Sequence, residues 1–115
     1  MNESDFKLRT KKFSLRIIKL VGALPKTAEG RAIGNQLIRS GTSVGANYRA
    51  VCRARSKADF IAKLGIVEEE TDECLFWLEL IIEAGLIEEE LIQALYTEAN
   101  EILSIVVTSI KSARK

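Results

Sequence analysis

The amino-acid sequence predicts an all-α protein, an antiparallel up-down-up-down four-helix bundle that assembles into a homo-oligomer. Its composition, 47% hydrophobic and 29% charged with a single proline, is typical of helical proteins. Apolar residues recur every three or four positions in four segments, and short turns separate these segments. The same segments contain more apolar residues than one core requires, which favours a second buried face and hence self-association.

A chain of 115 residues is long enough for one domain, and we expect that domain to span residues 1–115. The four helices are expected over about 5–24, 28–54, 57–84 and 88–111. Phe6, Phe13 and Ile17 repeat at helical spacing in the first helix. Pro25 restricts Leu24 to extended backbone, so this helix should end there.

The second helix should begin after Thr27, which is a suitable N-cap. Its glycines 34, 41 and 45 each cost about 1 kcal/mol relative to alanine inside a helix. They fall at i, i+7 and i+11 on one face, so the pattern predicts a neighbouring helix packed unusually close. The core face of this helix is predicted to carry Leu37, Val44 and Tyr48.

Ser56 should cap the third helix, with Asp59 in the capping-box position, and Gly85 should end it. The fourth helix should begin near Glu88, because acidic residues suit the positive end of a helix dipole. Its apolar residues follow a 3-4-3-4 spacing of the coiled-coil type. They are Ile92, Leu95, Ala99, Ile102 and Val106.

Several apolar residues lie off the predicted core stripes: Ile18, Val21, Ile61, Phe76, Trp77, Ile81, Leu103 and Ile110. Phe76, Trp77 and Ile81 are the candidate residues for an interface between copies of the chain. Trp77 has two interpretations, as a core residue or as an anchor between subunits. The second is favoured, because tryptophan is enriched among the residues that dominate interface energetics.

The net charge of +1 conceals a strong segregation of charge. From Lys7 to Lys63 there are 14 Lys/Arg against two acids, whereas Leu64 to Ile110 holds 12 acids and no Lys or Arg. In an up-down bundle most of these cations meet at one end, with a net charge of +9 against −8 for the rest. Such an end attracts polyanions. The candidates for phosphate contact are Lys7, Lys11, Lys12, Arg49, Arg53, Arg55 and Lys57.

The sequence therefore predicts a non-enzymatic oligomer that binds RNA or DNA through its basic end. The alternative is a structural or scaffolding oligomer whose charged ends solubilise it or meet other proteins. We expect no membrane partner and a cytoplasmic location, because no apolar run is long enough to span a bilayer and the N-terminus has no apolar signal region.

A second polar cluster is predicted between the second and third helices. A turn near Ser56 places antiparallel partners at residue numbers that sum to about 112, so Arg39 should lie opposite Asp72 or Glu73. We expect a partly buried network of Arg39, Ser43, Asn47, Glu69 and Glu73. It has two interpretations, a structural network that fixes the helix register or a binding pocket.

No catalytic residue, metal site or cofactor is predicted. The absence of histidine excludes Ser-His and Cys-His pairs and the Glu-x-x-His motifs of di-metal bundles. The same register separates Cys52 and Cys74 by roughly 20 Å, which is too far for a disulfide. Both are expected to be buried thiols.

Residues 39–80, RSGTSVGANYRAVCRARSKADFIAKLGIVEEETDECLFWLEL, resemble the four-helix-bundle family named after the 23S rRNA intervening-sequence protein. The family pattern appears in Arg39, Ser43, Asn47, Ser56, Phe60, Glu69 or Glu70, Glu73 and Trp77-Leu78. Many members carry N-I-A-E-G where this chain has Asn47-Tyr48-Arg49-Ala50-Val51, so any role of that acidic residue does not carry over.

This resemblance implies a homo-oligomer, a pentameric ring, and no established activity. The chain is also similar to the accessory variability determinant of diversity-generating retroelements. That similarity implies a pentameric barrel that binds nucleic acid and a protein partner, a reverse transcriptase. The near-neutral net charge departs from the strongly basic character of that relative, although the basic end of this chain partly restores it.

Overall fold

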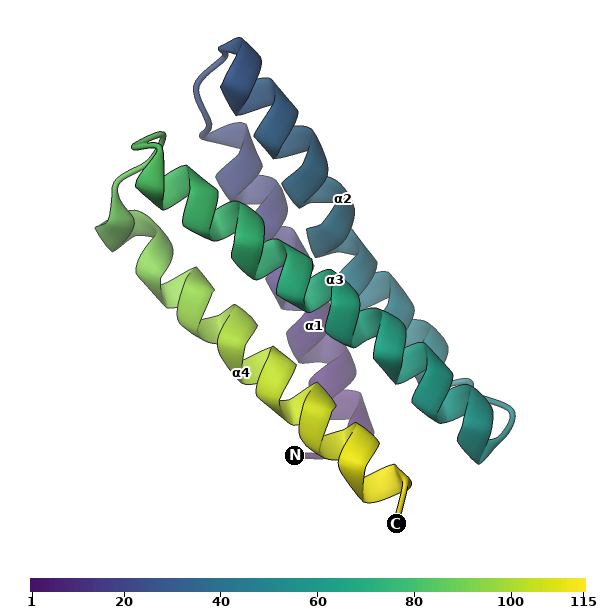
Figure 1. The fold of residues 1–115 in the computed structure, drawn as a ribbon. Helices are drawn as coiled ribbons and strands as arrows, with labels where there is room; N and C mark the ends of the chain where they lie inside the picture. The colour runs from purple at the N-terminus through teal and green to yellow at the C-terminus, as the bar shows by residue number, and fades with distance from the viewer.

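The computed structural model describes residues 1–115 as four α-helices with no strand. They are α1 (Glu3–Gly22), α2 (Ala28–Val51), α3 (Lys57–Glu83) and α4 (Glu89–Ala113). Successive helices are antiparallel neighbours, while α1 and α3 make no close contact and lie across the bundle from each other (Figure 1). The molecule is a rod of 45 × 21 × 20 Å. The predicted four-helix bundle is confirmed, and no helix is both long and apolar enough to cross a membrane.

The predicted helix starts and stops agree with the structure to within about three residues, and the caps explain why. The side chains of Thr27 and Ser56 accept hydrogen bonds from the N–H groups of Gly30 and Asp59, at 3.1 and 3.0 Å. Gly85 has a φ of 69°, in the left-handed region that favours glycine. It ends α3 in a Schellman motif.

Two helices end two or three residues earlier than predicted. α1 ends at Gly22 and α2 at Val51, because the next residues form tighter i→i−3 hydrogen bonds. Just after α2, the N–H groups of Arg53 and Ala54 donate to the carbonyl oxygens of the residues three positions earlier, at 3.0 Å each. The chain therefore turns before Arg53, and the last two arginines of this region lie in the α2–α3 connection.

The predicted close packing of two helices is confirmed, and it joins α1 to α2. A Cβ atom at Gly41 would lie 2.5 Å from Cγ2 of Ile17, and one at Gly45 would lie 2.7 Å from the Ser14 hydroxyl. At Gly41 the clash involves the Cβ of Ile17 as well, so this position requires glycine, whereas at Gly45 the Ser14 hydroxyl would have to rotate away. Ile17 is fully buried beneath this crossing, in the same core as Leu37.

The surplus apolar residues divide between the core and the surface. Ile81 is fully buried within the single chain and Ile110 nearly so, because both continue the core stripes of their helices. The prediction that Ile81 contributes to an interface is therefore wrong. Phe76 remains exposed at 51% and Trp77 is half-buried, so these two stay candidates. Leu8, Leu15, Ile66 and Leu91 are additional exposed residues that the sequence pattern did not single out.

Arg9 supplies the main polar link between α1 and α4, which touch far less than the other neighbouring helices. Its guanidinium donates two hydrogen bonds of 2.7 Å to the Glu98 carboxylate and one of 2.6 Å to Glu101. The hydrogen bond with Glu98, opposed by partial burial, raises the pKa of Arg9 above its ordinary value. Arg9 therefore belongs to a neutralised cluster, although its place in the sequence suggested a free cation of the basic end.

We expect replacement of Arg9 by alanine to lower the free energy of unfolding by about 1–3 kcal/mol, because Glu98 is largely buried and would lose its partner. The measurement is urea denaturation followed by circular dichroism. Arg31→Ala removes an exposed arginine that forms no ion pair, and this control should change stability by less than about 0.5 kcal/mol. Equal effects of the two substitutions would contradict the role assigned to Arg9.

Candidate nucleic-acid interface

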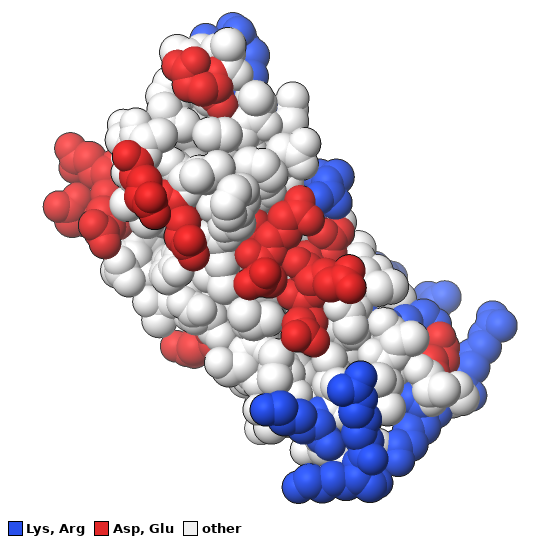
Figure 2. All heavy atoms as spheres, viewed as in Figure 1, with Lys and Arg blue, Asp and Glu red and all other residues white.

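The two chain termini and the α2–α3 connection meet at one end of the rod (Figure 1). Lys and Arg side chains gather at this end, whereas most of the acidic side chains visible in the same view lie over the middle and the other end (Figure 2). The charge segregation predicted from the sequence is thus a real feature of the surface. Several of these cations line two hollows at this end.

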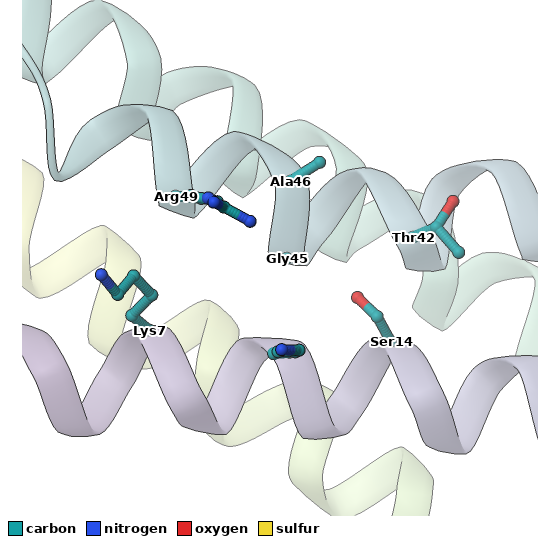
Figure 3. Close-up of a pocket in the computed structure, with 7 residues that line it drawn as sticks. Lys7, Ser14, Thr42, Gly45, Ala46 and Arg49 are labelled. Atoms are coloured by element: carbon teal, nitrogen blue, oxygen red, sulfur yellow. The ribbon is translucent and has the colours of Figure 1, made fainter.

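The first hollow lies between α1 and α2 and has a volume of about 440 Å³. Figure 3 shows Lys7 and Ser14 extending from α1 toward α2, and Arg49 on the facing helix α2. Gly45 and Ala46 also line the hollow. It is therefore lined by small residues on α2 and by cations from both helices.

The hydroxyl groups of this hollow are already engaged. Ser14 Oγ donates to the carbonyl oxygen of Gly41 at 2.7 Å, across the helix crossing. Thr42 Oγ1 donates to the carbonyl oxygen of Ile38 at 2.7 Å, within α2. Because each hydroxyl has one proton to donate, the donors that remain for an anion are the charged groups of Lys7, Lys11 and Arg49.

The second hollow lies between α2 and the start of α3, with a volume of about 490 Å³. It shares Ala46 and Arg49 with the first, so the two hollows are adjacent. We refer to them together as the basic groove. Its charged lining residues are Lys7, Lys11, Arg49, Arg53, Arg55, Lys63 and Asp59.

The one acid of the basic groove neutralises one of its cations. The Asp59 carboxylate accepts hydrogen bonds from Lys63 Nζ at 2.6 Å and from the Arg55 N–H at 3.0 Å. The hydrogen bond from Lys63 lowers the pKa of Asp59, with a smaller contribution from the Arg55 backbone. Asp59 therefore stays ionised at neutral pH and pairs with Lys63, while the other cations of the groove form no ion pair in the chain.

The groups of the basic groove that can contact a nucleic acid are its lysines and arginines. Neither an aromatic ring nor a side-chain amide lines it. Phe6 and Tyr48, two aromatic residues of this end, pack edge-to-face at 4.7 Å and are buried in the core. Burial raises the pKa of Tyr48 to about 12, so its hydroxyl stays neutral. The groove therefore offers mainly positive charge, which suits a phosphate backbone.

Five of the seven predicted phosphate-contact residues line the basic groove. Lys12 points elsewhere on α1, and Lys57 Nζ lies 3.4 Å from the terminal carbonyl of Lys115. Lys63 lines the groove but was not among the candidates. Its spacing of four residues from Asp59 on one helix was the sequence signal for both its position and its pairing.

The predicted polar cluster between α2 and α3 is only partly correct. Arg39 pairs with Glu73, as the register predicted, and its guanidinium lies 3.2 Å from Glu70. The Trp77 indole N–H donates to Glu73 at 3.3 Å. Burial alone would raise the pKa of Glu73, but the hydrogen bonds from Arg39 and Trp77 outweigh it and hold the pKa below its usual value.

Three other predicted members of that cluster, Ser43, Asn47 and Glu69, take no part in it. Asn47 Nδ2 donates to the Ser43 carbonyl within α2 at 2.8 Å, and Glu69 is exposed. The reason is geometric, because each step of four residues rotates about 40° around a helix. Asn47 has thus turned about 80° from Arg39, and Glu70 takes the place expected for Glu69. Arg39 is 52% exposed, so the cluster is a surface contact.

Neither cysteine forms a disulfide. Cys74 is buried and its thiol lies 3.4 Å from the Ser40 hydroxyl, while Cys52 is only half-buried. Burial raises the pKa of Cys74 to about 12, so this thiol stays protonated and unreactive. No three His, Cys, Asp or Glu side chains come together in a way that could hold a metal ion.

The fold and the site together define an antiparallel four-helix bundle with a basic groove at one end. The family model of the 23S rRNA-intervening sequence protein matches residues 3–108, so the chain belongs to that family. A crystal structure of a protein of unknown function from the S23 ribosomal protein family of Bacteroides thetaiotaomicron is similar, with a TM-score of 0.89. It is 35% identical, and the match covers 96% of this chain and 99% of that one. No curated protein matches the sequence.

Proposed function

We propose that this protein is a non-enzymatic homo-oligomer that binds RNA or DNA through the basic groove. The observation that supports the proposal most is the convergence of five cations with no ion pair in the chain: Lys7, Lys11, Arg49, Arg53 and Arg55. They come from α1, α2 and the α2–α3 connection, segments that only the folded bundle brings together. Holding like charges side by side is unfavourable unless an anion binds among them.

Phosphate is the anion that this groove suits. A nucleic acid carries closely spaced negative charges and releases condensed counterions when cations neutralise them. If about five phosphates are neutralised, affinity should fall by roughly 10²–10³-fold when salt rises fourfold. Because the groove has no aromatic ring or side-chain amide, binding should depend little on base sequence.

The test is binding of the purified protein to fluorescently labelled single- and double-stranded RNA and DNA at about 50 and 200 mM salt. Micromolar or tighter binding at low salt, with the steep salt dependence given above, supports the proposal. Absence of binding at low salt to all four probes would overturn it. Shuffled probe sequences of equal length test the expected indifference to sequence.

The second candidate function is a scaffolding oligomer that acts through protein–protein contacts. The exposed apolar residues Leu8, Leu15, Ile18 and Phe76 favour it, because exposed apolar surface marks protein contacts. A scaffold held by apolar burial should be almost insensitive to salt over the same range. A pentameric ring and a reverse-transcriptase partner remain predictions based on resemblance, and a cytoplasmic location remains a prediction based on the sequence.

A further inference from the structure

Two outer faces on opposite sides of the bundle have complementary character. Because α1 and α3 make no close contact, each presents its outer face on its own side of the molecule (Figure 1). Each outer face combines exposed apolar side chains with charges that have no partner in the chain. The charges on α1 are positive and those on α3 are negative.

On α1, Leu8, Leu15 and Ile18 are 53%, 56% and 45% exposed. They lie on the side of the helix opposite its buried residues, at spacings of seven and three. Three exposed cations on this helix, Lys12, Arg16 and Lys19, flank the apolar stripe and form no ion pair. We refer to these six residues as the α1 face.

On α3, Ile66 and Phe76 are 44% and 51% exposed. Glu69 and Asp72 lie between them in the sequence, are exposed and form no ion pair. Figure 2 shows a dense acidic patch over the middle of this helix. We refer to these four residues as the α3 face.

The two faces also match in height along the rod. Ser14 of α1 lies level with Gly41 of α2, and Arg39 of α2 lies level with Glu73 of α3. Through these two contacts, each residue of α1 lies at the same height as the α3 residue whose number is about 57 higher. This places three pairs at common heights, within about one residue: Leu8 with Ile66, Lys12 with Glu69, and Arg16 with Asp72. Ile18 and Lys19 fall level with Phe76 by the same relation. One apolar residue thus matches an apolar residue and two cations match acids, whereas Leu15 falls level with Asp72 and Lys19 with Phe76.

We infer that the α1 face of one copy of this chain packs against the α3 face of the next copy. This inference rests on the self-association included in the proposed function and assigns the surfaces that carry it. A contact between two different faces is heterologous, and such contacts close into a ring when the rotation between copies permits. A rotation axis parallel to the rod keeps matching residues at one height, and it also brings every basic groove to the same end of the ring.

A second copy of the chain is the occupant that the charges favour. A basic partner would meet repulsion on the α1 face, and an acidic partner would meet it on the α3 face. This chain carries one basic and one acidic face, so a second copy meets opposite charge at each of them. Self-association through them satisfies Lys12 and Glu69, and Arg16 and Asp72, in the same contact.

The test uses full-length variants and light scattering after size-exclusion chromatography, with circular dichroism to confirm folding. Leu15→Glu/Ile18→Glu disrupts the α1 face, and Ile66→Glu/Phe76→Glu disrupts the α3 face. All four side chains are exposed, so each variant should fold. Leu91→Glu is the control, because Leu91 is 72% exposed on α4 and outside both faces.

The expected result is an oligomeric wild type and control, with each double variant monomeric on its own. An equimolar mixture of the two double variants should form a dimer and nothing larger, because it retains one intact α1 face and one intact α3 face. A folded double variant with the wild-type mass, or a mixture that stays monomeric, would overturn the inference and leave the proposed self-association standing. A monomeric wild type would overturn both. Nucleic-acid binding is measured separately, so its failure is distinguishable from either result.

The charged pairs provide an independent check of register. Lys12→Glu should weaken the contact about two- to fivefold per interface, as is typical of an exposed ion pair, and Lys12→Glu/Glu69→Lys should restore it. The readout is the subunit dissociation constant from dilution experiments. Failure of the second substitution to restore the contact would contradict the pairing of these two residues across the interface.

Discussion

Replacing Arg49 and Arg53 by glutamate is expected to weaken nucleic-acid binding at least about 100-fold at low salt. Arg49 lines both hollows of the basic groove and Arg53 lines the second, so the change removes central phosphate donors. Each lost hydrogen bond between charged groups is worth about 1.5–3 kcal/mol, and the two new carboxylates repel the phosphates. The measurement is the dissociation constant for a labelled duplex at fixed ionic strength.

The control for this variant is Lys26→Glu/Arg31→Glu. It changes the net charge by the same amount, but Lys26 and Arg31 lie at the opposite end of the rod, near the start of α2. All four residues are exposed and unpaired, so neither variant should lose more than about 0.5 kcal/mol of stability. If both variants lost affinity equally, total charge rather than the basic groove would govern binding.

Replacing Gly41 by alanine is expected to destabilise the bundle by about 1–3 kcal/mol, despite the better helix propensity of alanine. The added Cβ would lie 2.5 Å from Cγ2 of Ile17 and 2.8 Å from its Cβ and Cγ1. Ile17 is fully buried and branches at Cβ, so no change of rotamer frees the space. The helices α1 and α2 would have to separate, and the measurement is the urea midpoint.

Gly65→Ala is the matched control for that substitution. Gly65 lies in the middle of α3, and a Cβ there would meet nothing within 4 Å. The same chemical change should therefore stabilise the protein by about 0.5–1 kcal/mol. If the two substitutions changed stability in the same direction, close packing would not be the reason for glycine at position 41.

The helices could be predicted from the sequence because each is specified locally. The signals that specify them act within a turn or two of their own position. They are the N-caps Thr27 and Ser56, Gly85 at the end of α3, and the apolar period of three to four residues. The close packing of α1 on α2 was also predictable, since three glycines on one face of a helix leave room for a neighbouring backbone. The partner helix was not predicted, because glycines on one face specify a close approach and not what approaches.

The candidate site could be predicted only to the level of one end of the bundle. Up-down topology was enough to place Lys7, Lys11, Arg49, Arg53 and Arg55 together. It could not show that Lys12 points away from the groove, because that depends on how α1 rotates against α2 at Gly45.

Contacts between helices that are distant in the sequence could not be predicted either. Arg9 is neutralised by Glu98, 89 residues away in the chain, and no local pattern reveals that contact. Ile81 looked like a surplus residue because α3 is apolar on several sides, and only packing against its neighbours shows that it is in the core.

The most direct test of the basic groove as the binding site is lysine acetylation read by mass spectrometry, with and without bound nucleic acid. We predict that Lys7 and Lys11, which line the groove, become protected when a duplex binds, whereas Lys26 at the opposite end keeps its reactivity. Protection of Lys26 with Lys7 and Lys11 still reactive would contradict the assignment of the basic groove.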